Sequence, residues 1–329
     1  MGSDFVRTAR AKIQESNTLD VVIQGLQRTP KQIPSFLLYD KEGDKLFREI
    51  MQLPEYYLTR CEAEILQNQS LLMAEHFTTD NTPFDIVELG AGDGTKTELL
   101  LRVLLEQNAD FRYLPVDVSE NVLQLLSERL RKNLPALRVE PIHGRIEYIH
   151  DVLHHEPRKV FLYLGANIGN FAFFQAEDFL RGIADAMDDR DMLLIGFDLK
   201  KDPRRILSAY DDHSGVTARF NLNLLQRLNR EFGADFNLRQ FQHVPTYDPE
   251  TGVTKSFLVS RADQRVRFRD SGVAIDFSAW ETIHTEVSVK YNMQDIRRLA
   301  IGSGLEVVDT FTESKGWFAD VLFSRIQKD

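Results

Sequence analysis

The sequence predicts an α/β protein in which a parallel sheet carries helices on both faces and a second, α+β domain interrupts the chain. Two observations lead to this prediction. From Phe84 to Phe197, short apolar runs alternate with helical stretches, which is typical of parallel strands joined by helices. After Asp198 the alternation stops, and a long polar-faced helical stretch is followed by strand-like segments.

The alternating part of the chain gives the order of the elements. The expected strands are Ile86–Leu89, Phe111–Val116, Leu137–Ile142, Val160–Leu164 and Met192–Phe197. The expected helices begin near Thr95, after Ser119 and near Gln175. A helix at Asp295–Gly304 and two strands, in Glu306–Ser314 and Phe318–Arg325, would close the sheet.

The remaining segments are expected to form the second domain. Residues 5–28 should be helical, turns should lie at Lys41–Asp44 and Pro54, and another helix should begin near Thr59. Strands are expected at Phe241–Tyr247, Lys255–Ser260 and Val266–Arg269. We therefore expect one domain of residues 61–199 and 291–329, and a second of residues 1–60 and 200–290.

Composition and charge restrict the class of function. The chain has 329 residues, 43% hydrophobic and 27% charged, as in ordinary globular proteins. Its net charge of -10 disfavours nucleic acid as a partner. The single cysteine, Cys61, excludes an intrachain disulfide and a zinc site of several thiolates, and we interpret it as a helix residue without chemistry. Because we find neither a long apolar run nor a signal peptide, we expect a cytoplasmic monomer that acts on a small molecule, with no membrane and no metal.

The stretch DIVELGAGDGTKTELLL, from Asp85 to Leu101, places three glycines between an apolar strand and a helix. It does not match G-x-G-x-x-G, and it lacks the Gly-Lys-Ser/Thr of a phosphate loop, so a pyrophosphate ligand is disfavoured. The shape E-x-G-x-G-x-G, beginning at Glu88, resembles the first motif of S-adenosylmethionine-dependent methyltransferases. Asp117, at the end of the next strand, stands where that fold places an acid that accepts the ribose hydroxyls. A plain strand-to-helix turn is the alternative.

Longer segments resemble one family. They are LPEYYLTRCEAEIL, ELGAGDGTKTELLL, LGANIGNF, DLKKDPRRILSAYDDHSGVTARFNLNLLQRLNREFGADFN and TEVSVKY. Together they are similar, in the same order and over nearly the whole chain, to the histidine-specific methyltransferases. Those enzymes form hercynine, the Nα-trimethyl betaine of histidine and the first intermediate of ergothioneine.

The resemblance implies a fold, a cofactor and its site. The fold is a Rossmann-like class I methyltransferase domain with a substrate-binding domain made by the N-terminal segment and a central insertion. The cofactor is S-adenosyl-L-methionine. The implied cofactor-binding residues are Glu88, Gly90, Gly92, Lys96, Asp117, Arg145 and Ile146.

The resemblance also implies an amino acid site. Tyr39, Tyr56, Asn170 and Tyr210 surround the amino and carboxylate end of the substrate, and Glu286 and Ser288 meet the imidazole, with Ser256 beside the ring. Tyrosine hydroxyls and an asparagine amide bind a carboxylate without a positive charge near the cationic cofactor. Tyr39, or a water that it holds, is the candidate base, and Asn170 offers its carbonyl to the amine.

Several of these residues also have a structural interpretation. Tyr56 and the neighbouring Tyr57 could be packing aromatics, and the motif context favours a functional role for Tyr56 and a structural one for Tyr57. Asn170 could cap a turn. Glu286 and Ser288 share one face of a strand and could belong to a solvated surface. We interpret Lys290 as a surface charge, and Asp211 and Asp212 as surface acids or supports for Tyr210.

Two departures from the family pattern leave alternatives open. Arg145-Ile146 stands where relatives usually carry an acidic pair at the adenine, and an arginine has no acceptor for the adenine amino group. Ser256 stands where the family has a methionine beside the substrate ring. A methyltransferase of the same fold acting on another amino acid or amine is therefore the first alternative. A cofactor-binding partner protein without turnover is the second.

Overall fold

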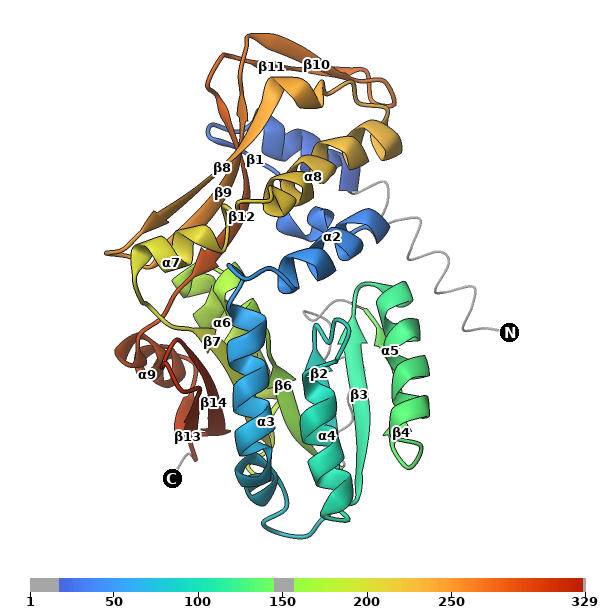
Figure 1. The fold of residues 1–329 in the computed structure, drawn as a ribbon, viewed down its shortest axis with the longest axis vertical. Coiled ribbons are helices and arrows are strands. Elements are labelled where there is room, and N and C mark those ends of the chain that lie inside the picture. The colour runs from blue at the N-terminus through green and yellow to red at the C-terminus, as the bar shows by residue number, and fades with distance from the viewer. Residues whose placement is uncertain (1–17, 145–156, 328–329) are drawn as a thin grey trace. The chain divides into compact units, whose positions relative to one another are not determined.

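The computed structural model describes residues 18–144 and 157–327, and the chain folds into two compact units. The insertion unit comprises the residues up to Tyr56 together with Pro203–Asp248 and Thr254–Val287. The sheet unit comprises Tyr57–Asp202, Pro249–Val253 and the residues from Ser288 onward. Figure 1 labels their elements along the chain.

The sheet unit is built on one large sheet. Its strands are β2 (Phe84–Leu89), β3 (Phe111–Asp117), β4 (Arg138–Val139), β5 (Ile142–His143), β6 (Arg158–Tyr163), β7 (Met192–Asp198), β13 (Leu305–Thr312) and β14 (Phe318–Arg325). Their order is β13-β14-β7-β6-β2-β3-β4, and β5 pairs with β3. The strands from β7 to β4 run parallel, whereas β14 is antiparallel to both β7 and β13. This arrangement confirms the predicted α/β class and the closing strand pair.

Helices of the sheet unit connect these strands and cover the sheet. They are α3 (Leu58–Phe77), α4 (Thr97–Glu106), α5 (Glu120–Asn133), the 3-10 turn η3 (Asn167–Asn170), α6 (Phe173–Ala186) and α9 (Met293–Gly302). In this unit α3 packs against α4, and α6 packs against α9 (Figure 1). Ser119 caps α5 by accepting the N–H of Val122 at 3.4 Å, which confirms the predicted start of that helix. Among the described residues no helix is both long and apolar enough to cross a membrane.

The insertion unit combines helices with a second sheet. After a helix over residues 18–27, its elements are β1 (Lys31–Gln32), η1 (Ser35–Leu38), α2 (Lys41–Met51), α7 (Pro203–Ser208), α8 (Val216–Phe232), η4 (Leu238–Gln240), β8 (Phe241–Asp248), β9 (Val253–Ser260), β10 (Gln264–Phe268), β11 (Val273–Phe277) and β12 (Thr282–Val289). Four strands form a sheet in the order β1-β12-β9-β8, and β10 and β11 form a hairpin. The first residue of β9 and the last two of β12 belong to the sheet unit.

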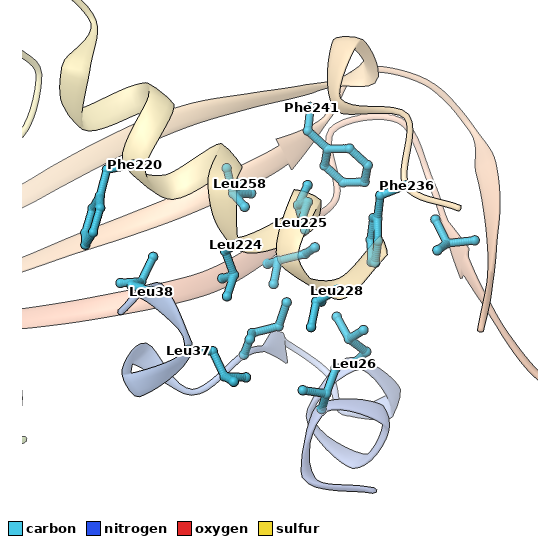
Figure 2. Packing of buried hydrophobic residues seen from close by; sticks show 14 of the residues in the cluster. Leu26, Leu37, Leu38, Phe220, Leu224, Leu225, Leu228, Phe236, Phe241 and Leu258 are labelled. Carbon is cyan, nitrogen blue, oxygen red and sulfur yellow. The ribbon is translucent and has the colours of Figure 1, made fainter. Parts of the chain in front are cut away.

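The core of the insertion unit forms around one face of α8. Leu224, Leu225 and Leu228 on that face are fully buried. Figure 2 shows them beside Leu26 and Leu37 from the N-terminal segment. Burying a leucine side chain contributes about 2 kcal/mol, so these contacts hold the N-terminal segment onto the central insertion despite their separation in the sequence.

Two local predictions are wrong, and one strand was missed. Lys41–Asp44 is the first turn of α2 rather than a loop, because the side chain of Asp40 accepts the N–H of Gly43 at 2.7 Å and caps the helix. The expected strand Leu137–Ile142 is divided into β4 and β5. Strand β11, which pairs with β10, was not predicted.

Candidate active site

The glycine turn after β2 lies at the carboxyl end of the parallel strands, where sheets of this kind bind ligands. Gly90, Gly92 and Gly94 have φ angles of 70°, 55° and 59°, which glycine adopts without strain. The N–H groups of Gly90 and Ala91 donate to the carbonyl of Val116 at 2.8 and 3.0 Å and hold the turn against β3. A Cβ added to Gly92 would meet no atom within 4 Å, so the backbone there is open to a ligand.

Asp117 ends β3 beside this turn. Its Oδ2 accepts the N–H of Gly92 at 2.9 Å, and its Oδ1 accepts the N–H of Ser119, also at 2.9 Å. A carboxylate has about four acceptor positions, so each oxygen keeps capacity for another donor, such as a sugar hydroxyl. The structure therefore brings Asp117 together with Gly90 and Gly92.

Glu88 lies behind the turn. It is buried, and its carboxylate accepts hydrogen bonds from the hydroxyl of Thr97, at 2.6 Å, and from the hydroxyl of Tyr113. Burial raises the pKa of Glu88 to about 7, although the two hydrogen bonds oppose the shift. Through Thr97, the first residue of α4, Glu88 fixes the start of the helix that follows the glycines.

Lys96 belongs to a buried charge cluster at the same end of the sheet. Its ammonium group pairs with Glu62, which is fully buried and whose Oε1 accepts the N–H of Gly165 at 2.6 Å. Burial is the largest single influence and would lower the pKa of Lys96, but the ion pair and hydrogen bond with Glu62, together with smaller contributions from Asp320 and Glu88, raise that pKa. Asp320 on β14 is fully buried, and its oxygens have no hydrogen-bond partner among the described residues. Burial, reinforced by the negative charge of Glu62, raises the pKa of Asp320 well above its ordinary value.

Tyr39 and Tyr56 come together in the insertion unit. Both are half-buried, and both contact the ring of Phe47 on α2 edge-on, with centroid distances of 5.6 and 6.2 Å. Tyr39 also meets Phe220 on α8 at 5.7 Å. The two tyrosines therefore share one aromatic cluster built by α2 and α8.

Tyr210 lies just before α8 and is largely buried. Two residues later, Asp212 accepts the N–H groups of Val216 and Thr217 at 2.8 and 2.7 Å and so caps the helix. Burial opposes ionisation, yet these hydrogen bonds lower the pKa of Asp212 to about 2. Asp212 is thus a helix cap, which differs from both roles considered for it from the sequence.

Ser256 lies on β9 and is 1% exposed. Its carbonyl accepts the hydroxyl of Thr285 at 3.1 Å, and that hydroxyl also donates to Asn221 on α8 at 2.7 Å. The hydroxyl oxygen of Ser256 has no hydrogen-bond partner among the described residues. The hydrogen bond between Ser256 and Thr285 is thus made by the backbone of Ser256, and Thr285 precedes Glu286 and by strand alternation faces the other side of β12.

Asn170 and Ser288 come together in the sheet unit. Asn170 ends η3 and is exposed. A Cβ added to the preceding residue, Gly169, would lie 2.8 Å from the carbonyl oxygen of Val289 and 3.4 Å from Oγ of Ser288. Glycine is therefore needed for η3 to approach the end of β12 this closely, and the approach places Ser288 beside the turn that carries Asn170.

Lys290 is fully buried, so its interpretation as a surface charge is wrong. Its ammonium group donates to Oγ of Ser288 at 2.8 Å and contacts Oδ2 of Asp198 at 2.8 Å. Asp198 also contacts Lys201 and accepts the hydroxyl of Tyr57, at 3.0 and 2.9 Å to its two oxygens. Burial alone would raise the pKa of Asp198, but the two ammonium groups outweigh it and lower that pKa. Tyr57 has the structural role that was predicted for it.

Comparison with known proteins identifies the family. Residues 17–325 match the family model described as histidine-specific methyltransferase, SAM-dependent. The chain belongs to this family. It is 37% identical over 297 residues to the histidine N-alpha-methyltransferase of Mycobacterium tuberculosis, covering 90% of this chain and 91% of that protein. It is 35% identical over 294 residues to the protein of the same name from Mycolicibacterium smegmatis, covering 89% and 90%. Ergothioneine biosynthesis protein 1 of Schizosaccharomyces pombe is 33% identical over 296 residues, which are 88% of this chain and 38% of that protein.

S-adenosylmethionine is the cofactor of this methyltransferase, and the glycine turn fits it. Gly92 leaves open space where any other residue would place a side chain, and Asp117 beside it retains acceptors for two hydroxyls. Lys96 is a cation that is 22% exposed, suited to the carboxylate of the methionine part. Arg145 and Ile146, expected at the adenine, lie outside the described residues.

Sequence reasoning missed the buried ionic partners of the methyltransferase. Glu62 and Asp320 gave no local signal, because each lies far along the chain from Lys96. Asp198 pairs with Lys201 nearby in the chain but also with the distant Lys290, and that second pairing was not foreseen. Asp198 does have one recognisable feature: an acid at the end of a buried parallel strand, like Asp117. Cys61 was predicted correctly as a helix residue, since it is buried in α3, and burial raises the pKa of its thiol to about 11.

Proposed function

We propose that this chain transfers methyl groups from S-adenosylmethionine to the α-amino nitrogen of L-histidine and that three rounds give hercynine. The observation that carries the proposal is the match of residues 17–325 to the histidine-specific family. Two relatives that are 37% and 35% identical and bear the name histidine N-alpha-methyltransferase support it.

The geometry of the sheet unit supports the proposed cofactor roles. We assign the ribose to Asp117, the close backbone approach to Gly90 and Gly92, and the methionine carboxylate to Lys96. Glu88 acts indirectly, because its hydrogen bonds to Thr97 and Tyr113 occupy its carboxylate behind the turn. The adenine contacts expected of Arg145 and Ile146 remain part of the proposal.

The substrate roles rest on the chemistry of the side chains. Tyr39, Tyr56, Asn170 and Tyr210 hold the amino and carboxylate groups, and Glu286 and Ser288 hold the imidazole. Glu286, an acceptor only, takes a ring N–H, and Ser288 meets the other ring nitrogen. Gripping the substrate at both ends orients its nitrogen for reaction.

The reaction is an in-line displacement at the methyl carbon. When bound, S-adenosylmethionine supplies an electrophilic methyl group. The chain needs no strong base, because an α-ammonium group titrates at about 8 to 9 and a usable fraction is free amine near neutrality. Asn170 offers its carbonyl to the amine. Tyr39, or a water that it holds, is the proposed base: it takes the proton that the ammonium group loses and passes a proton on to solvent. A loosely held amine can then reorient between rounds.

Ser256 favours a second candidate, a methyltransferase acting on another amino acid or amine. Its hydroxyl is buried and has no hydrogen-bond partner among the described residues, at a position where the family carries a methionine. A polar group there would suit a substrate with an additional hydrogen-bonding atom, since a buried hydroxyl without a partner is costly.

Mass spectrometry distinguishes the two candidates. The pure protein is incubated with S-adenosylmethionine and histidine, and in parallel with the other amino acids and histamine. Histidine that gains three methyl groups supports the proposal. Methylation of another compound in preference to histidine would move the substrate assignment and point to Ser256.

A further inference from the structure

We propose that Lys290 fixes the direction of the hydrogen bond at Ser288, so that the site accepts the neutral imidazole of histidine in one tautomer. The proposal rests on the proposed function, because it takes histidine as the substrate and Ser288 as a contact of its ring. It adds a positioning residue and a chemical form of the substrate.

Lys290 is the donor in its contact with Ser288. An ammonium group has hydrogens to donate and no lone pair, so in the 2.8 Å contact between Lys290 and Ser288 the lysine donates and Oγ accepts. The hydroxyl hydrogen of Ser288 must then point to another acceptor. A hydroxyl that already accepts from a cation is polarised, which strengthens it as a donor and weakens it as a second acceptor.

A buried carboxylate holds Lys290 in place. Its side chain is fully buried, and its ammonium group contacts Oδ2 of Asp198 at 2.8 Å. Asp198 is fixed in turn by the hydroxyl of Tyr57 at 3.0 and 2.9 Å and by Lys201. The ammonium therefore has a charged, buried anchor on β7, and it cannot swing away from Ser288 without leaving that anchor.

Glu286 and Ser288 make different demands on the substrate ring. Glu286 and Ser288 lie two residues apart on β12, so their side chains leave the same face of the strand. A carboxylate accepts only, so Glu286 requires a ring nitrogen that carries a hydrogen. Ser288, made a donor by Lys290, requires a ring nitrogen with a free lone pair. A neutral imidazole in a single tautomer meets both requirements, whereas an imidazolium has hydrogens on both nitrogens.

The test compares histidine with its pyrrole analogue, in which the ring nitrogen without a hydrogen is replaced by CH. Dissociation constants are measured by calorimetry with S-adenosylhomocysteine present. We expect the wild-type protein to prefer histidine by about ten- to a hundredfold, because the analogue leaves the Ser288 donor unpaired. In Lys290→Met the preference for histidine over the analogue should fall to the value found for Ser288→Ala. The double variant, with both substitutions, should lose no more of this preference than Ser288→Ala alone.

Lys290→Met is expected to fold, because Asp198 keeps its contacts with Lys201 and Tyr57. The control is Lys200→Met, which removes a nearby lysine that pairs with Asp295 at 3.3 Å. The control should keep the full preference for histidine. The role of Lys290 would be overturned if Lys290→Met kept the full preference for histidine over the analogue. It would also be overturned if the losses of preference in the two single variants added up in the double variant.

A second measurement needs no variant. Nitrogen NMR of ring-labelled histidine bound to the wild-type protein should show one protonated and one bare ring nitrogen. Two protonated nitrogens would overturn the inference while leaving histidine a substrate. If the wild-type protein methylates another compound and does not bind histidine, the proposed function itself fails, and the inference fails with it.

Discussion

The backbone N–H of Gly92 donates to Oδ2 of Asp117 over 2.9 Å, which joins the glycine turn after β2 to the end of β3. The same carboxylate accepts the N–H of Ser119, the cap of α5, through its other oxygen. One acid thus organises three backbone segments at the carboxyl edge of the sheet. It still keeps acceptor capacity for a ligand, so the shape of the turn and its affinity for a ribose depend on the same side chain.

Replacing Asp117 should affect the cofactor selectively. We expect Asp117→Ala to weaken S-adenosylmethionine binding by about ten- to a hundredfold, since hydrogen bonds to a charged group contribute about 1.5–3 kcal/mol. Histidine binding should change little. Calorimetry with each ligand measures both constants, and Asp117→Asn, which keeps one acceptor oxygen, should lose less. Unchanged cofactor affinity in Asp117→Ala would remove this residue from the site.

The open space at Gly92 predicts a steric effect on the cofactor. Gly92→Ala should cost about 1 kcal/mol of folding stability, because φ is 55°, and its methyl group should also obstruct S-adenosylmethionine. Gly316→Ala is a matched control, with φ of 63° and likewise no atom within 4 Å of an added Cβ. Urea unfolding should show similar losses in both variants, and calorimetry should show weaker cofactor binding in Gly92→Ala only. Equal cofactor affinity in the two variants would contradict an open ligand site at Gly92.

The sequence was sufficient to predict the sheet and its ligand edge but not the charges beneath it. Alternating strands and helices identify a parallel sheet, and the glycines and Asp117 mark its carboxyl edge, because these signals are local. The burial of Lys290 was not predicted, because it depends on Asp198. That residue lies 92 positions earlier (290 − 198), at the end of β7. A lysine is usually exposed, and only its distant partner explains why this one is not.

Gly43 illustrates a second limit of sequence reasoning. A glycine among charged residues usually indicates a turn, and Lys41–Asp44 was interpreted in that way. In the structure Gly43 lies within α2, where an added Cβ would lie 1.9 Å from the carbonyl oxygen of Leu38. The glycine serves a close backbone approach, a tertiary requirement that the local pattern cannot reveal.

The buried Glu88 predicts a pH dependence of stability. Its pKa rises from 4.5 to about 7 on folding, so the folded state binds the proton more tightly. The contribution of this proton to the free energy of unfolding is therefore complete below pH 4.5 and is lost as the pH rises to about 7. We expect the stability of the wild type relative to Glu88→Gln to fall by about 3 kcal/mol over this range. Urea unfolding of both proteins at several pH values gives the difference, and a flat difference would contradict the prediction.

Two neighbouring tyrosines should respond differently to the same change. Tyr57→Phe removes a buried hydroxyl that donates to Asp198, and it should cost about 1–3 kcal/mol of folding stability. Tyr56→Phe keeps the ring that packs on Phe47, so its loss of stability should be smaller, but its KM for histidine should rise. Thermal unfolding and steady-state kinetics of the two variants separate these effects. A larger stability loss in Tyr56→Phe, with KM unchanged, would reverse the roles.

Glu286 should determine affinity for the imidazole without affecting the cofactor. We expect Glu286→Ala to weaken histidine binding by about ten- to a hundredfold, because a ring N–H loses a charged acceptor. Glu286→Gln keeps a carbonyl acceptor and should recover part of the loss. Glu306→Ala, which removes an exposed strand glutamate on β13, serves as the control and should bind histidine as the wild type does. Calorimetry with S-adenosylhomocysteine and with histidine measures both sites in each variant. Equal losses of both ligands in Glu286→Ala would show that the substitution disturbs the fold and would break the assignment of Glu286 to the ring.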